Sequence, residues 1–173
     1  LLFIIMISLI IFFARHLFLQ FKNVKAIAWG LLGFAAIYAV SVAYSLIISI
    51  FIEIAPNNNE SAVRDMVNNF PAISIITIVF LGPICEELTY RVGLFDLVKR
   101  KNTILAYVVT IAVFALIHFD FTAEDMVMEF VNLPQYMIAG FILTYTYKKY
   151  GLAASVAAHI FNNAFSVIST LAA

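Results

Sequence analysis

The sequence predicts an all-α fold, a polytopic bundle of about six transmembrane helices. Hydrophobic residues make up 64% of the 173 residues and charged residues only 12%, whereas soluble domains contain about 45–50% and about 25%. The mean hydropathy is +1.03, so the chain has more apolar surface than a soluble fold of this size can bury. This composition excludes a soluble globular protein, a disordered chain and a nucleic-acid-binding protein, and it makes the lipid bilayer the expected environment.

Polar clusters divide the chain into six apolar segments. They are, approximately, residues 1–14, 27–54, 71–98, 103–119, 133–147 and 152–172. Helices are expected because lipid cannot satisfy a free backbone group, and the strict alternation of a barrel strand is missing from the sequence. A span needs about 20 residues, so the second and third segments must tilt or protrude, and the fifth is of marginal length.

The basic residues fall on every second connection between these segments. Eight of the ten lie there: Arg15, Lys22, Lys25, Lys99, Arg100, Lys101, Lys148 and Lys149. The other two connections are mainly acidic, with Glu60, Asp65, Asp120, Glu124, Asp125 and Glu129 beside Arg64. The positive-inside rule places the basic loops in the cytoplasm and the acidic loops outside. The net charge of zero indicates no further partner.

The predicted spans form two parts. Residues 1–70 contain two N-terminal spans, with residues 16–25 expected to lie along the cytoplasmic interface, and residues 71–173 form a four-helix core. Because the chain begins at Leu1 inside an apolar run without a Met, we expect a truncated N-terminus.

One acidic connection, residues 122–131, resembles a helix start. It opens with Thr122 and has Asp125 three residues later, which is an imperfect capping box and predicts a short helix. An ordinary connector is the alternative here and for residues 16–25.

Three ionisable residues lie inside the third apolar segment. Glu86 and Glu87 precede Lys99 by about 13 residues, hence about 20 Å along a helix, and such groups are costly in lipid. Glu87 and Arg91 are four residues apart, which predicts an ion pair. Glu86 lies about 100° around the helix and is expected to pair with Tyr90. A carboxylate without a cation suits a general base; the alternative is that both glutamates only stabilise packing.

Gly82 and Pro83 precede this pair by one turn. Pro83 cannot donate to the carbonyl four residues back, so we expect a kink that frees a carbonyl near the carboxylates. A kink kept for packing is the alternative. Cys85, the only cysteine, has no basic partner one turn away and is expected to fill the core.

Two histidines and one asparagine lie inside later spans. His118 ends the fourth segment, and His159 precedes Asn163 by four residues in the sixth. Counted from the basic loops, these residues and the glutamates share a layer about 12–22 Å deep. A lone histidine in a membrane is usually a packing residue, but two on separate helices at the depth of a glutamate pair indicate a site. His16 is expected at the surface.

This set of groups fits hydrolysis of an amide. Glu86 would take a proton from water with help from His118, while His159 and Asn163 would face the carbonyl oxygen. Glu86, His118 and His159 could instead hold a catalytic zinc, since two His and one carboxylate are a known ligand set. The sequence contains no HExxH motif, so it does not require zinc and leaves it open.

The motifs resemble those of a known family. Residues 86–91 match EExxxR, Phe114 to His118 match FxxxH, and His159 to Asn163 match HxxxN. Residues 71–170 thus resemble the CPBP family of intramembrane proteases, which comprises CAAX proteases and bacteriocin-processing enzymes and is also called Abi.

The resemblance implies cleavage of a peptide bond within the membrane. The expected substrate is a lipid-modified C-terminal CaaX peptide or another hydrophobic peptide, such as a bacteriocin or signal peptide. It also implies Glu86 as the catalytic base, with His118, His159 and Asn163 beside it. Supporting roles are implied for Glu87 and Arg91, and the expected pairing with Glu86 indicates a supporting role for Tyr90. Family members are described both as metalloproteases and as metal-free glutamate proteases. The short chain is more typical of a bacterial cell-membrane member.

Two other functions remain as alternatives. A bacteriocin-immunity or adaptor protein could bind a peptide in the same pocket without cutting it. A proton-coupled carrier could also use buried Glu and His, but the sequence has no inverted repeat that would favour it.

Overall fold

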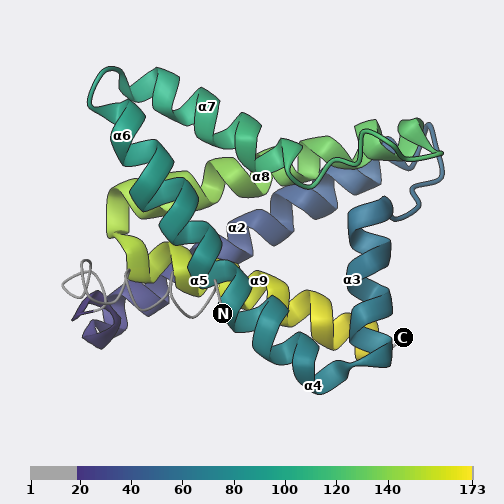
Figure 1. The fold of residues 1–173 in the computed structure, drawn as a ribbon, viewed down its shortest axis with the longest axis horizontal. Coiled ribbons are helices and arrows are strands. Elements are labelled where there is room, and N and C mark those ends of the chain that lie inside the picture. The colour runs from purple at the N-terminus through teal and green to yellow at the C-terminus, as the bar shows by residue number, and fades with distance from the viewer. Residues whose placement is uncertain (1–18, 173) are drawn as a thin grey trace.

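The computed structural model describes residues 19–172, and within them it contains helices and no strand (Figure 1). The elements are η1 (Leu19–Lys22), α2 (Val24–Ile48), α3 (Asn58–Asn69), α4 (Pro71–Ser74), η2 (Ile75–Leu81), α5 (Gly82–Glu87), η3 (Leu88–Phe95), α6 (Asp96–Lys99), α7 (Thr103–Leu116), α8 (Met126–Tyr150) and α9 (Leu152–Ala172). The five from α4 to α6 follow one another as a single helical stretch, in which η2 and η3 are π-helical. The predicted all-α fold is confirmed.

Four helices are long and apolar enough to cross a membrane: α2, the stretch Pro71–Lys99, α8 and α9. Their average hydropathy and length agree with the polytopic prediction. The first predicted span, residues 1–14, and His16 lie outside the described residues. The fourth predicted span is shorter than expected, because α7 has 14 residues and is only about 21 Å long. It ends where the backbone turns at residues 117 and 118.

The connections differ more from the prediction than the spans do. The acidic connection after α2 contains α3, a helix that the sequence analysis did not predict; the Asn57 side chain caps it by accepting from Glu60 N–H at 3.0 Å. The short helix predicted from Thr122 is wrong. Asp125 accepts from Met128 N–H at 3.1 Å and caps α8, which continues for 25 residues through the fifth predicted span.

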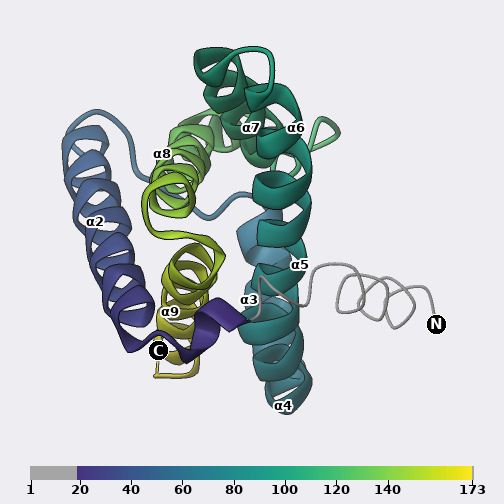
Figure 2. The same ribbon diagram turned by 90° about the vertical axis from the view of Figure 1, so that its left-hand side faces the viewer.

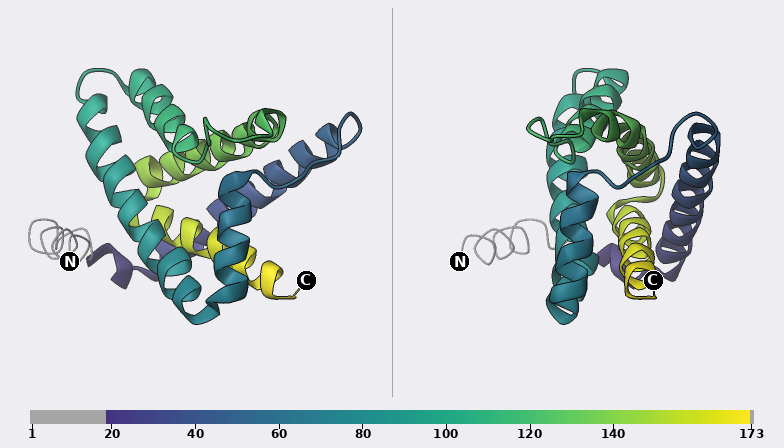
Figure 3. Two further views of the ribbon diagram at one scale, coloured as in Figure 1. Left: turned by 45° about the vertical axis from the view of Figure 1, so that its right-hand side comes forward. Right: turned by 90° about the vertical axis from the view of Figure 1, so that its right-hand side faces the viewer.

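Figure 2 shows α8 and α9 between α2 on one side and the stretch from α4 to α6 on the other. Helix α2 approaches α9 closely because Gly30 carries no side chain: a Cβ there would lie 2.6 Å from Ala157 Cβ. The reversal from α8 to α9 takes a single residue, Gly151, whose φ of 90° is the conformation that glycine adopts without strain. Figure 3 shows α3 between the loop that follows α2 and the start of α4, and α3 contacts both α4 and α9.

The basic ends of the helices lie together. In Figure 1 the start of α2 and the ends of α6 and α8 are on the left, and the start of α8 and the end of α2 are on the right. This arrangement agrees with the alternation of charge in the sequence. The assignment of the basic side to the cytoplasm stays a prediction.

Candidate active site

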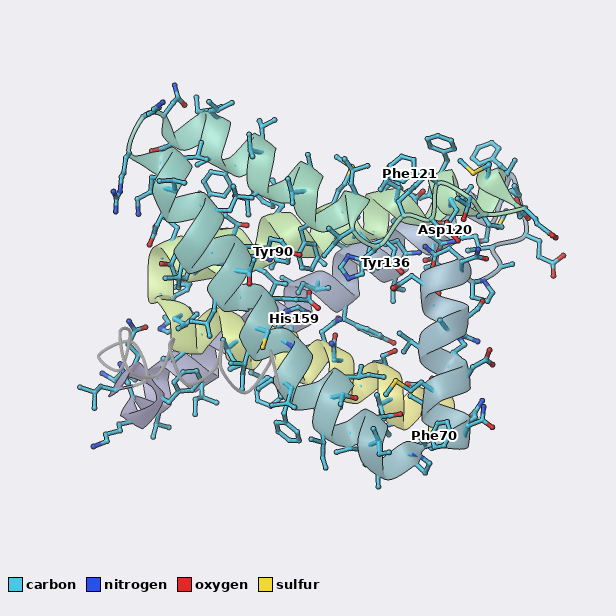
Figure 4. All side chains as sticks on the ribbon, viewed as in Figure 1. Phe70, Tyr90, Asp120, Phe121, Tyr136 and His159 are labelled. Carbon is cyan, nitrogen blue, oxygen red and sulfur yellow. The ribbon has the colours of Figure 1, made fainter. Side chains whose placement is uncertain are left out.

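A cavity of about 530 Å³ lies inside the bundle, bordered by α2, α3, α7, α8, α9 and the stretch around Gly82. Four residues predicted to form a site, Glu86, His118, His159 and Asn163, all line it. They come from three separate parts of the chain, so the structure brings together what the sequence could place only by depth. Figure 4 shows His159 near the middle of the bundle.

The predicted ion pair between Glu87 and Arg91 is present beneath the cavity. Arg91 Nε lies 3.2 Å from Glu87 Oε2, and neither side chain has any exposed area. The guanidinium carbon also lies 4.7 Å from the centroid of the Phe114 ring, a cation–π distance. Both charges are therefore paired inside the protein, as a buried charge requires.

Glu87 has a second partner that the sequence analysis missed. Its Oε1 accepts from His159 Nδ1 at 3.0 Å. A carboxylate at this distance can only accept, so Nδ1 carries the proton and Nε2 of a neutral His159 carries the lone pair. Glu87 thus fixes the ring orientation and tautomer of His159. The two residues are on different helices, and no local spacing could have revealed this contact.

Glu86 faces the cavity rather than the protein interior. Its side chain is 29% exposed, and Oε2 lies 4.0 Å from His159 Nε2. This oxygen accepts no hydrogen bond from the described residues. The predicted pairing with Tyr90 is wrong, since no hydrogen bond joins them in the described part of the chain. The Tyr90 ring instead packs edge-on against Phe114, with centroids 5.8 Å apart. The π-helical segment η3 begins between Glu86 and Tyr90, which changes the spacing on which the predicted pairing depended.

His118 lies just beyond the last residue of α7 and is held on two sides. Its Nδ1 is 2.7 Å from the Phe114 carbonyl oxygen. The carbonyl can only accept, so Nδ1 is the protonated nitrogen and Nε2 has the lone pair. The ring stacks on Tyr136 of α8, with centroids 4.6 Å apart and planes 16° apart. Tyr136 was not among the predicted residues, although it follows Asn132 and Gln135 on a span with unusual polar content.

Asn163 is fixed by the backbone around Pro83. Gly82 N–H donates to Thr77 O, five residues back. In that register the next donor, to Ile78 O, would be residue 83, which as proline has no N–H. Asn163 Nδ2 donates to Ile78 O at 2.9 Å instead. The carbonyl that lacks its helical donor is therefore that of Ile78, not that of the predicted residue 79, because the backbone here is π-helical.

The three candidate zinc ligands, Glu86, His118 and His159, share the cavity but are not gathered around one point. Within residues 19–172, no three His, Cys, Asp or Glu side chains lie close enough to hold a metal ion. This arrangement does not fit a metal centre. Cys85 is buried and does not line the cavity.

Comparison with known proteins gives a family match over the same region. The model of the family described as type II CAAX prenyl endopeptidase Rce1-like matches residues 68–165. This range includes Glu86, His118, His159 and Asn163. No solved structure matches the chain.

Three curated proteins are similar to the chain. The UPF0177 protein YvdC of Lactococcus lactis is 22% identical over 142 residues, covering 82% of this chain and 52% of the relative. An uncharacterized protein of Mycoplasma capricolum is 29% identical over 160 residues, covering 85% and 44%. The membrane-embedded CAAX protease MroQ of Staphylococcus aureus is 31% identical over 181 residues, covering 97% and 68%. The chain therefore spans about half the length of the first two relatives and two thirds of the third.

Proposed function

This chain belongs to the Rce1-like family of type II CAAX prenyl endopeptidases, and from that premise we propose that its central cavity hydrolyses a peptide bond within the membrane. The observation that carries the proposal is the position of Glu86. It is a carboxylate inside a membrane-spanning helix, it faces a cavity, and its Oε2 accepts no hydrogen bond from the described residues. An ionisable group kept at such cost is expected to serve function.

In the proposed reaction, Glu86 Oε2 accepts a proton from a water molecule, which attacks the carbonyl carbon of the scissile bond. His118 Nε2, which has its lone pair free, helps to orient that water. The proton then passes to the leaving amine as the carbon–nitrogen bond breaks. Each step uses atoms that line the cavity or face it.

The negative charge on the carbonyl oxygen needs hydrogen-bond donors. Asn163 has a second Nδ2–H beyond the one that binds Ile78 O, and a protonated His159 presents Nε2–H on the side opposite Glu87. Glu87 holds the His159 ring through Nδ1, and Arg91 pairs with Glu87. We assign Glu87 and Arg91 to support of the site rather than to contact with substrate.

Zinc bound by Glu86, His118 and His159 remains the alternative way of activating the water. The open arrangement of these side chains in residues 19–172 supports the reaction driven by Glu86.

The substrate is proposed by class. The protein is an integral membrane protein, and the cavity lies between its apolar helices, so a hydrophobic or lipid-modified peptide fits it best. The family description names prenylated CAAX substrates, and we propose a peptide with a lipid-modified C-terminal CaaX sequence, or another membrane-embedded peptide, as the substrate. We further propose the bacterial cell membrane as the location, with the basic loops in the cytoplasm.

The experiment is cleavage of a farnesylated CaaX peptide and of a bacteriocin precursor peptide by the purified protein in liposomes. We expect Glu86→Gln to reduce kcat by about 10²–10⁴-fold, the usual contribution of a general base. Glu53→Gln, an exposed glutamate between α2 and α3, is the matched control and should retain activity. A fully active Glu86→Gln protein would refute the assignment. Binding of either peptide without cleavage by the unaltered protein would favour the adaptor alternative.

A further inference from the structure

A second carboxylate, Glu129, is buried at the opposite end of the fold from the basic loops. It lies in the first turn of α8 and is 1% exposed. Acidic residues are common in a first turn because the helix dipole favours them. However, the hydrogen bonds of Glu129 go to other parts of the chain, and this distinguishes it from an ordinary first-turn acid.

Three donors from two segments converge on this carboxylate. Glu129 Oε1 accepts from Asn58 N–H at 2.9 Å, and Oε2 accepts from Asp120 N–H at 3.0 Å and from Asn57 Nδ2 at 3.3 Å. Asp120 is two residues beyond His118. Glu129 thus ties the turn that carries His118 to the start of α3 and to α8.

Asn57 joins the same turn more directly. Its Nδ2 also donates to the His118 carbonyl oxygen at 3.3 Å, and its Oδ1 accepts from Glu60 N–H at 3.0 Å and from the Tyr136 hydroxyl at 3.2 Å. All four hydrogen-bonding positions of this amide are therefore used. Asn57 is 2% exposed, so losing any of these bonds would leave a buried polar group unpaired.

Tyr136 connects this network to the imidazole ring. Its hydroxyl donates to Asn57 and accepts from Asn59 Nδ2 at 3.2 Å, while its ring stacks on His118. Figure 4 shows Tyr136 and Asp120 on the side of the bundle near α3. The backbone and the ring of His118 are therefore held by one connected set of hydrogen bonds, in which the Glu129 carboxylate accepts three.

We propose that Glu129 is a positioning residue for His118: by accepting from Asp120, Asn57 and Asn58, it sets the backbone turn that points His118 Nε2 into the cavity. The proposal rests on the role of His118 in the proposed function. Charge-assisted hydrogen bonds of this kind are stronger and more directional than neutral ones. A catalytic group displaced by about 1 Å can lose about 10²-fold in rate, so a remote carboxylate can control the reaction without touching the substrate.

The test compares Glu129→Gln with Glu124→Gln, an exposed glutamate on the same connection. The glutamine amide presents a donor to one of the N–H groups that Glu129 accepts, so the turn should loosen. We expect kcat for the farnesylated CaaX peptide to fall by roughly 10–100-fold, with KM changed by less than about twofold. Glu124→Gln should match the unaltered protein in both constants.

A spectroscopic measurement tests the proposal independently of cleavage. The chain has three histidines, so ¹⁵N-histidine labelling gives few signals, and a His118→Gln variant assigns those of His118. In the unaltered protein we expect a protonated Nδ1 and an unprotonated Nε2 on His118. Glu129→Gln should give a mixture of tautomers for His118 and leave the His159 signals unchanged, because Glu87 holds His159 separately. A single Nδ1–H tautomer of His118 in Glu129→Gln would overturn the proposal.

If Glu129→Gln does not fold, Glu129→Asp carries the test, because it keeps the charge but draws the carboxylate back by one methylene group from the N–H groups of Asp120 and Asn58. It should show less of the Nδ1–H tautomer of His118 than the unaltered protein. A single Nδ1–H tautomer of His118 in Glu129→Asp would overturn the proposal. If the Glu129 variant changes the His118 tautomer as expected but the unaltered protein cleaves neither peptide, the proposed function is refuted and the positioning of His118 by Glu129 stands.

Discussion

His159 and Glu87 meet across two helices: imidazole Nδ1 lies 3.0 Å from carboxylate Oε1, although the residues are 72 positions apart in the sequence. Glu87 also pairs with Arg91 one turn further along its own helix. The two adjacent glutamates therefore have different surroundings, since Glu87 is enclosed by partners and Glu86 faces the cavity. This difference is the basis for giving them different roles.

Replacing Arg91 with methionine should destabilise the protein strongly. The substitution leaves Glu87 buried without its cation, and removing one partner of a buried pair costs about 3–5 kcal/mol. Unfolding by denaturant in detergent micelles measures the loss. Lys99→Met is the control, because the pair of Lys99 with Asp96 is 41% and 35% exposed and such pairs contribute about 1 kcal/mol or less. Equal losses in the two variants would contradict the structural role of Arg91.

Asn163→Ala should lower kcat with little change in KM. If the asparagine amide stabilises the oxyanion, its loss is expected to reduce kcat by about 10²–10³-fold. Asn162→Ala is the matched control: this neighbouring amide also lines the cavity but only donates to Asn163 Oδ1 at 3.4 Å. Steady-state kinetics with the farnesylated peptide give kcat and KM for both variants, and only Asn163→Ala should show the lower kcat. A change confined to KM would assign Asn163 to substrate binding instead.

Cleavage should persist when metal is removed. Glu86, His118 and His159 are not gathered around one point, and Glu86 can activate water without a Lewis acid. The measurement is the rate of peptide cleavage with and without a strong chelator, together with elemental analysis of the purified protein. Loss of activity with the chelator, followed by recovery on addition of zinc, would establish the metal-dependent alternative.

Gly30→Ala should separate α2 from α9. The added methyl group would lie 2.6 Å from Ala157 Cβ and 2.7 Å from the Ala154 carbonyl oxygen, and overpacking of this kind typically costs about 1–3 kcal/mol. Gly93→Ala is the control, because its nearest neighbour, Leu88 O, is 3.5 Å away, an ordinary contact. Thermal unfolding in detergent should show a lower midpoint for Gly30→Ala alone. A midpoint as high as that of Gly93→Ala would show that the helices can move apart freely.

The spans were the most predictable part of the fold. Segment 152–172 corresponds to α9, since Lys148, Lys149 and Gly151 mark the reversal before it. Segment 71–98 corresponds to the stretch Pro71–Lys99. Long apolar runs bounded by charge specify such helices because the bilayer sets their length. The same reasoning missed α3, because its polar residues gain helical structure from the Asn57 cap and from packing of Val67 against Val79 and Val167.

The site was predictable in membership but not in geometry. Depth along each helix brought Glu86, His118, His159 and Asn163 to one layer, and the structure places all four on one cavity. Hydrogen-bond partners depend on how helices rotate relative to one another, and the π-helical segments change that rotation within a single stretch. For this reason the Glu87–His159 contact and the stacking of Tyr136 on His118 could not be read from spacing.

Pro83 has a consequence for how the bundle can move. Because proline has no N–H, the Ile78 carbonyl accepts from the Asn163 amide instead, and this bond joins two neighbouring helices. Moving α9 along its axis by one residue would break this bond and leave the Ile78 carbonyl without a donor, at a cost of about 1–3 kcal/mol. This hydrogen bond therefore favours one alignment of α9 against the stretch Pro71–Lys99.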